Sequence, residues 1–195
     1  RDSAFVSSLK FIGDAQAGLL NKNTTMAMSF YPKEGNPLWE EESTKAVVNT
    51  LKTYSEMTIE YPYPVAISVH AADIGMEYPM ICFNYGRPNQ KGSYSAMTKW
   101  NMISVIIHEV GHNFFPMIIN SDERQWTWMD EGINTFLQYL SEQEWDLIYR
   151  SDRGEPRYIV DYMKSNYQVP IMTNSESILQ FGNNAYAKPA TALVI

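Results

Sequence analysis

Two of the three histidines in this sequence stand four residues apart, in the stretch HEVGHNFFP that begins at His108. In an α-helix, residues four apart differ by about 40° in azimuth, so the imidazoles of His108 and His112 would project from one face. That separation suits two ligands of one tetrahedral zinc ion, and Glu109 between them could reach a water at the open position. The alternative is a helix that carries two surface or core histidines by chance, without a metal.

A third candidate ligand follows in the stretch WTWMDEGINTF, where Glu131 stands nineteen positions after His112. A helix pair joined by a loop of that length can return a carboxylate to the histidine face of the first helix. Zinc that keeps one position for water needs three protein ligands, and two histidines with one glutamate form an established catalytic set. Glu131 could instead only favour the start of its own helix electrostatically. Because suitable residues occur together at this spacing, the sequence predicts a zinc site at His108, His112 and Glu131.

The composition is that of a soluble globular protein, since 45% of the 195 residues are hydrophobic and 19% are charged. This length allows one domain with a sizeable core. A net charge of −7 argues against nucleic acid or an anionic membrane as a partner, and no apolar run is long enough to span a bilayer. The single cysteine, Cys82, excludes an internal disulfide. Because the chain begins at Arg1 and stops within the apolar run TALVI, we expect a segment of a longer protein.

The elements that must position these residues are mostly strands in the first ninety residues. The stretches TTMAMSFYP and PVAISVH alternate larger apolar residues with small or polar ones, which is the period of a half-buried strand, and PMICFNY is a third strand candidate. A helix is expected between the first two strands. One face of that helix carries Val47, Leu51 and Tyr54.

Helices dominate the second half of the sequence. The helix that carries the two histidines is expected over residues 96–115, where a following proline limits its continuation. A second helix is expected to start near Thr127, because Thr127 and Asp130 match a capping-box pattern. The sequence therefore predicts a single α+β domain over residues 1–195, with a strand-rich lobe over 1–90 and a helical lobe over 91–195.

The spacing of these motifs resembles that of a known family. HExxH, followed by eighteen residues and by Glu131 within WMDEG, resembles the gluzincin metallopeptidases of the aminopeptidase N family. GMEYP (75–79) resembles the family's Gly-x-Met-Glu-Asn exopeptidase motif, and NAYAKPATAL resembles its Tyr-x-Lys segment. The resemblance covers nearly the whole chain and is most specific in the two zinc helices.

The resemblance implies a thermolysin-like metallopeptidase catalytic domain, in which a mixed β-sheet lobe precedes the helical lobe that carries the zinc site. It implies that His108, His112 and Glu131 bind one Zn²⁺ per chain. Glu109 would act as the general base that takes a proton from water and passes it to the leaving amine. Tyr186 would donate a hydrogen bond to the oxyanion of the tetrahedral intermediate.

The same resemblance implies a substrate-binding role for the GMEYP segment. Glu77 would pair with the free α-ammonium of a peptide, while Gly75 and Met76 beside it would leave room for the substrate main chain and contact it. The chain departs from the family motif at Tyr78, where the family usually has Asn, so the shape of the specificity pocket stays open. His70, the third histidine, is expected to be a structural residue and not a ligand.

The sequence therefore predicts a zinc-dependent aminopeptidase that hydrolyses the N-terminal peptide bond of peptides. Two alternatives stay open: a zinc endopeptidase of the same fold, and a non-catalytic peptide-binding module that retains zinc. The resemblance also implies flanking domains in the parent chain, and family habit favours an extracytoplasmic location.

Overall fold

The computed structural model describes residues 11–20 and 23–195, which divide into two compact units, one up to Val110 and one from Gly111 onward. The sequence placed the change from strands to helices near residue 90. The compact units instead divide at the end of the histidine-bearing helix, between Val110 and Gly111. The single catalytic domain over residues 1–195 stays a prediction.

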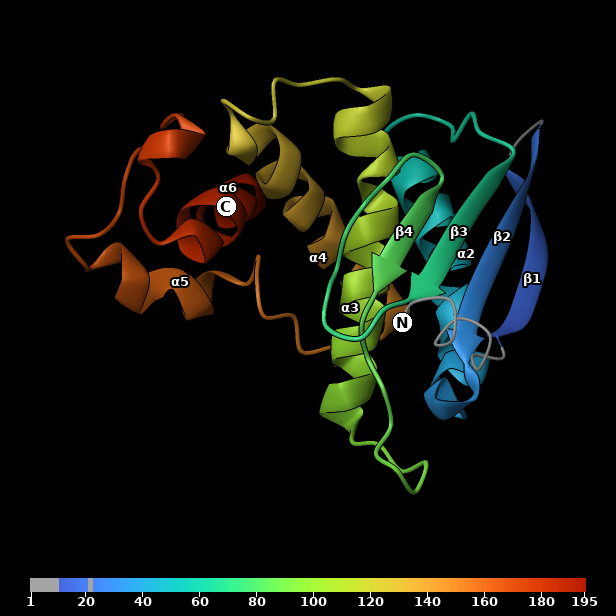
Figure 1. Cartoon of the computed structure of the whole chain (residues 1–195). Helices are drawn as coiled ribbons and strands as arrows, with labels where there is room; N and C mark the ends of the chain where they lie inside the picture. The colour runs from blue at the N-terminus through green and yellow to red at the C-terminus, as the bar shows by residue number, and fades with distance from the viewer. Residues whose placement is uncertain (1–10, 21–22) are drawn as a thin grey trace, which may run out of the picture. The chain divides into compact units, whose positions relative to one another are not determined.

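The first unit is a four-stranded mixed sheet with two long helices (Figure 1). The strands lie in the order β1-β2-β3-β4, with the first pair antiparallel and the other two pairs parallel. The three predicted strands are thereby confirmed as β2, β3 and β4, and β1 is an additional strand that pairs with β2. The elements are β1 (Phe11–Leu20), β2 (Asn23–Pro32), α2 (Leu38–Met57), β3 (Val65–His70), β4 (Ile81–Asn84) and α3 (Ala96–Gly111).

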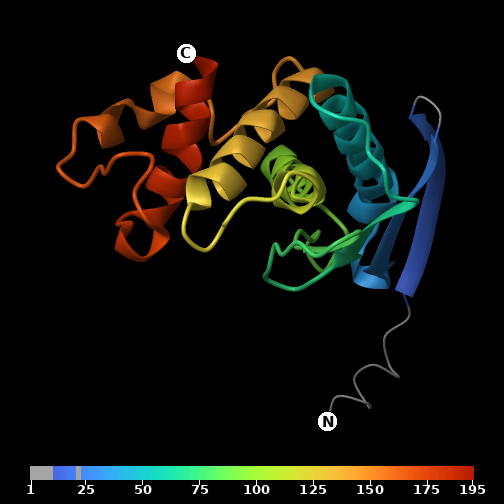
Figure 2. The same ribbon diagram turned by 90° about the horizontal axis from the view of Figure 1, so that it is seen from above.

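The buried face of the sheet is the one with the small side chains. On β2 and β3 the Met, Phe, Val and Ile side chains are half-buried, or exposed in the case of Met26, and the larger residues on the buried side are Tyr31 and His70. The helix α2 contacts β1, β2 and β3 and lies along one side of the sheet (Figure 2). Small residues let that helix approach closely, so they form the buried side although they bury less apolar area per residue. The buried residues are Thr25, Ala27, Ser29, Tyr31, Ala66, Ser68 and His70.

The two long helices bury the faces that the sequence indicates. Val47, Leu51 and Tyr54 of α2 are buried as expected. The helix α3 ends at Gly111, earlier than the predicted residue 115. A π-helical turn, Asn113–Ile118, follows it, and within that turn Phe115 is extended (φ −134°, ψ 108°). The residue before a proline disfavours the helical region, which explains why the regular helix stops here.

The second unit is helical and consists of short elements. The predicted capping box at Thr127 is wrong, because this side chain contacts the Ser175 hydroxyl and the helix start has no side-chain cap. The second helix instead opens with a π-helical turn. The elements after Ile118 are the π-helical turn Trp128–Gly132 (η3), α4 (Ile133–Trp145), α5 (Pro156–Met163), a 3-10 turn Ser175–Ser177, the π-helical turn Gly182–Ala187 (η5) and α6 (Lys188–Val194).

No helix among the described residues is both long enough and apolar enough to cross a membrane.

Candidate functional site

The two histidines of the HExxH motif lie one turn apart on one helix. His108 is in the last turns of α3, and His112 keeps helical torsions just after its end (φ −60°, ψ −19°). Because the backbone is helical through both positions, their relative placement follows from the local geometry. Both side chains are buried. The predicted pairing of the two imidazoles on one helix face is therefore present.

The second unit fixes which nitrogen of His112 points toward Glu131. Nδ1 lies 2.9 Å from the carbonyl oxygen of Phe115, to which it donates its proton, and the Asp130 carboxylate lies within ion-pair distance of the same nitrogen, with Oδ1 at 2.9 Å. Nε2 faces Glu131 Oε2 at 3.3 Å. A histidine that donates through one nitrogen in this way presents the other as a metal ligand, with its ring orientation held. Asp130 thus contacts His112 and does not cap its helix.

The charges around His112 favour a cation at this place. Burial alone would lower the pKa of His112, but the hydrogen bonds to Asp130 and Glu131 and the negative charges of these carboxylates raise it well above its usual range. Two carboxylates beside one buried imidazole need a positive charge, which a proton or a metal ion can supply.

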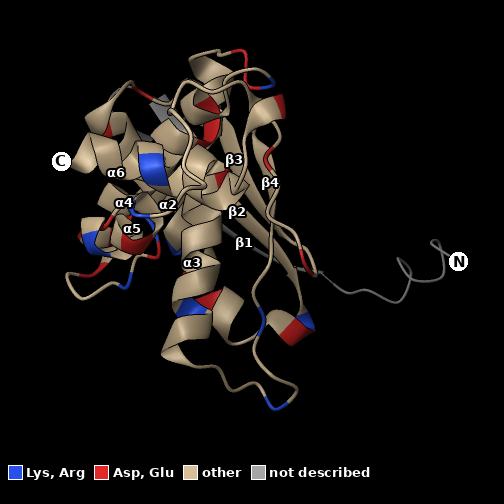
Figure 3. Ribbon diagram, turned by 90° about the vertical axis from the view of Figure 1, so that its left-hand side faces the viewer, with Lys and Arg blue, Asp and Glu red and all other residues tan. Residues whose placement is uncertain are grey.

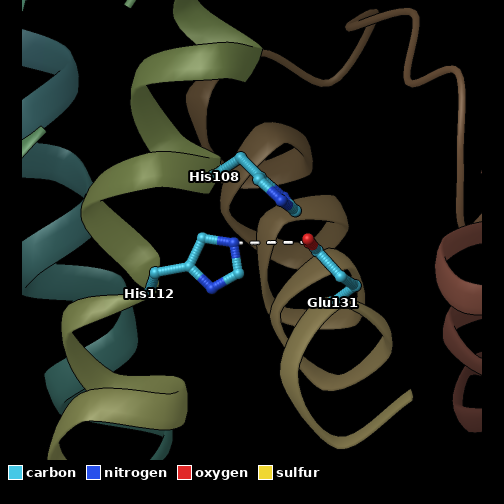
Figure 4. A group of neighbouring side chains, drawn as sticks. All are labelled: His108, His112 and Glu131. Carbon is cyan, nitrogen blue, oxygen red and sulfur yellow. Dashed lines mark ion pairs between the residues drawn. The ribbon is translucent and has the colours of Figure 1, made fainter. Parts of the chain in front are cut away.

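The donor atoms fit one zinc ion. Zinc binds histidine nitrogen and carboxylate oxygen at about 2.0–2.2 Å, so two ligands of a tetrahedral site lie about 3.4 Å apart. The separation of 3.3 Å between His112 Nε2 and Glu131 Oε2 matches that edge. Each of His108, His112 and Glu131 offers one ligand atom of a kind that zinc binds. Figure 4 shows the Glu131 carboxylate pointing toward the ring of His112, with their ion pair drawn as a dashed line.

Tyr186 lies beside the carboxylate of Glu131. Its phenol donates a hydrogen bond of 2.7 Å to Glu131 Oε1. Gly132 makes this approach possible, because a Cβ on Gly132 would stand 2.5 Å from Pro189 Cγ and 3.1 Å from the carbonyl oxygen of Ala185. The glycine that follows the third candidate ligand therefore lets the tyrosine segment close onto it.

The GMEYP segment lies at the free edge of the sheet in the first unit. Met76 exchanges two backbone hydrogen bonds with Phe83 of β4, at 2.9 and 2.8 Å, which holds Glu77 next to the sheet edge. Glu77 and Glu109 each offer a carboxylate oxygen, and the two oxygens lie within 4.8 Å of each other. Gly75 packs directly on Glu109, because a Cβ there would stand 3.2 Å from Glu109 Cδ and closer still to Oε1.

Glu109 is conspicuous on its helix. Besides His108, the helix α3 carries one lysine, Lys99, and one carboxylate, Glu109, and Figure 3 shows most of the ribbon in the colour of uncharged residues. The Glu109 side chain is buried. A buried carboxylate on an apolar helix costs free energy, which is typical of groups retained for chemistry.

No family model matches this chain, but individual known proteins do. The alanine/arginine aminopeptidase of Saccharomyces cerevisiae is 20% identical over 187 residues, which cover 89% of this chain and 22% of that protein. An M1 zinc metallopeptidase from Deinococcus radiodurans superimposes with a TM-score of 0.68 at 16% identity, covering 94% of this chain and 39% of that one. The chain has the fold of the M1 zinc metallopeptidases.

Two further solved structures are similar to this chain in fold. A variant of the Deinococcus enzyme bound to the peptide Tyr-Ser-Ala has a TM-score of 0.66 at 17% identity, and it is covered to 39%. The aminopeptidase A of Legionella pneumophila, in complex with aspartic acid, has a TM-score of 0.62 at 14% identity, with 93% of this chain and 21% of that one covered. The chain spans about a fifth of the length of its curated relative. These proteins are named as aminopeptidases or zinc metallopeptidases, which are hydrolases, and this agrees with the family resemblance seen in the sequence.

His70 has the structural role that the sequence predicted, whereas Arg153 was not predicted. His70 is structural: it is buried beside the ring of Trp39 and accepts a hydrogen bond of 3.4 Å from Arg87 Nε. Cys82 is a buried residue of β4, and burial raises the pKa of its thiol to about 12. Arg153, whose guanidinium lies over the ring of Tyr186, had no signal in the sequence, because a single arginine in a polar loop follows no pattern.

Proposed function

We propose that this chain is the catalytic region of a zinc-dependent aminopeptidase and that it is thermolysin-like in architecture. The observation that supports the proposal most directly is the tetrahedral-edge distance between His112 Nε2 and Glu131 Oε2, with Asp130 behind the imidazole. His108, His112 and Glu131 would bind one Zn²⁺. Bound zinc would supply Lewis acidity toward the scissile carbonyl and the attacking water.

The residues of this chain would move the protons and orient the substrate. Glu109, next to His108 on the helix, takes a proton from the attacking water and returns it to the leaving amine. The phenol of Tyr186, already within hydrogen-bond distance of a proposed zinc ligand, donates to the developing oxyanion.

In this proposal, the Glu77 carboxylate directs hydrolysis to the amino-terminal residue of the peptide substrate. A carboxylate at a sheet edge pairs with the α-ammonium of a peptide, and the backbone at Met76 lies in the same edge. Glu77 also stands near Glu109, so a substrate ammonium between them reduces the repulsion of two like charges. Endopeptidases do not need this carboxylate, and a purely structural zinc site does not need Glu109.

The test uses purified protein, its metal content and a pair of matched substrates. We expect one zinc per chain and hydrolysis of aminoacyl p-nitroanilides but not of the same compounds acetylated at the amino group. Replacement of Glu109 by Gln should keep the zinc and lower kcat by about 10²–10⁴-fold. Unchanged hydrolysis by that variant would refute the mechanism, and rapid cleavage of blocked peptides would favour the endopeptidase. Zinc without any hydrolysis would favour the non-catalytic peptide-binding module.

The flanking domains and the extracytoplasmic location inferred from the sequence stay predictions.

A further inference from the structure

We infer that Arg153 is a positioning residue for Tyr186, an inference that rests on the proposed function. The guanidinium carbon of Arg153 lies 4.2 Å from the centroid of the Tyr186 ring. The ring of Phe181 meets the same tyrosine nearly edge-on, with centroids 5.9 Å apart and an interplanar angle of 67°. Tyr186 is therefore held by its hydroxyl at Glu131 and by two contacts to its ring.

The loop that presents Arg153 is anchored on both sides. Before it, the hydroxyl of Ser151 donates to the buried carboxylate of Glu142. After it, Gly154 has φ +92°, a conformation that favours glycine, and a Cβ there would stand 2.6 Å from the ring of Tyr139. These two contacts fix the backbone on both sides of Arg153, so its exposed side chain extends toward Tyr186 from a fixed point.

The Tyr186 ring is the partner that the structure provides for this guanidinium. Within residues 11–20 and 23–195, no carboxylate lies within ion-pair distance of Arg153. The nearby Arg157 differs, because it stacks on Tyr158 at 4.8 Å and its Nε also lies 3.7 Å from Glu155 Oε1. Arg157 is thus a matched control: the same residue type makes the same kind of ring contact, but on a tyrosine outside the proposed site.

The contact of the Arg153 guanidinium with the Tyr186 ring affects the direction in which the Tyr186 hydroxyl points. A hydroxyl that stabilises an oxyanion must lie about 3 Å from it, along one direction, at the moment of reaction. A cation held over the ring face restricts rotation and tilt of the ring without competing for the hydroxyl. Because Tyr186 acts on the transition state, loss of its orientation lowers kcat and leaves KM nearly unchanged.

The experiment compares Arg153→Ala with Arg157→Ala in the full chain. We expect Arg153→Ala to lower kcat by about threefold to tenfold and to leave KM, zinc content and thermal stability unchanged. Arg153→Lys should restore part of the loss, since an ammonium keeps the cation–π attraction but not the planar stacking. Arg157→Ala should match the wild type. Equal kcat for the two alanine variants, with kcat lowered by Tyr186→Phe, would overturn the inference and leave the proposed function standing.

A double-mutant cycle separates positioning from a general structural role. In the Tyr186→Phe background, Arg153→Ala should have no further effect on kcat, because the hydroxyl to be oriented is gone. The same fold-loss in both backgrounds contradicts positioning. If the wild type does not hydrolyse peptides, the proposed function fails. The aromatic NMR resonances of Tyr186 then test whether Arg153 contacts its ring. Arg153→Ala should shift them and Arg157→Ala should not; unmoved resonances refute the contact.

Discussion

The contact between Gly75 and Glu109 leads to a prediction about catalysis at an unaltered zinc site. In Gly75→Ala, the new methyl group would stand closer than 3.0 Å to Glu109 Oε1 and 3.2 Å from Val105 Cγ1. To reach ordinary contact, the carboxylate oxygen must withdraw by about 1 Å. A misplacement of about 1 Å in a catalytic group costs up to about 10²-fold in rate, or about 2.7 kcal/mol of transition-state stabilisation.

The fold should tolerate this substitution. The closest atom is the far end of a flexible glutamate side chain, and the backbone of Gly75 is not in the left-handed region. We therefore expect the unfolding free energy to fall by less than about 1 kcal/mol. The assay is kcat/KM on an aminoacyl p-nitroanilide, with zinc content and thermal unfolding measured on the same preparation.

The control is the double variant Gly75→Ala with Glu109→Gln. If the methyl group acts through the carboxylate, the double variant should be as active as Glu109→Gln alone. Wild-type kcat/KM in Gly75→Ala would refute the reasoning. A double variant clearly below Glu109→Gln would show that Gly75 acts on the substrate by a separate route.

Three further predictions concern Asp130, Gly132 and His70. Asp130→Ala removes the carboxylate that lies 2.9 Å from His112 Nδ1, so zinc affinity measured by chelator competition should fall about 10- to 100-fold; unchanged affinity contradicts the orienting role. Gly132→Ala should overpack the tyrosine segment and lower the unfolding free energy by about 1–3 kcal/mol in urea titration, whereas Gly182→Ala, which meets only an arginine nitrogen at 3.8 Å, should not. Burial, with the charge of a neighbouring arginine, lowers the pKa of His70 to about 4, so the folded state resists protonation that the unfolded state accepts from about pH 6.5 downward. The unfolding free energy should therefore fall by up to about 3 kcal/mol between pH 6.5 and 4, and His70→Gln should abolish this part of the fall in urea titrations at several pH values.

The sequence alone determined the parts of this protein that depend on local geometry. Two histidines four residues apart share a helix face wherever the backbone is helical, so the pairing of His108 with His112 follows from the helical period. The strands β2, β3 and β4 follow from alternation in the same way. The prediction of Glu131 as a third ligand rested on its spacing after His112 and was supported by the family resemblance, because no local rule returns a carboxylate across a loop.

Several arrangements are compatible with the local patterns of this sequence. Only the tertiary structure decided which of them occurs, because it brings elements that are distant along the chain into contact. It placed the small residues of β2 and β3 on the buried side, where an alternating pattern allows either face. It turned Asp130 toward His112 and not toward a helix end. It also set Gly75 against Glu109 and Arg153 over Tyr186. The physical reason is that periodicity is a property of neighbouring residues, whereas these contacts join residues distant along the chain and depend on packing that no local pattern records.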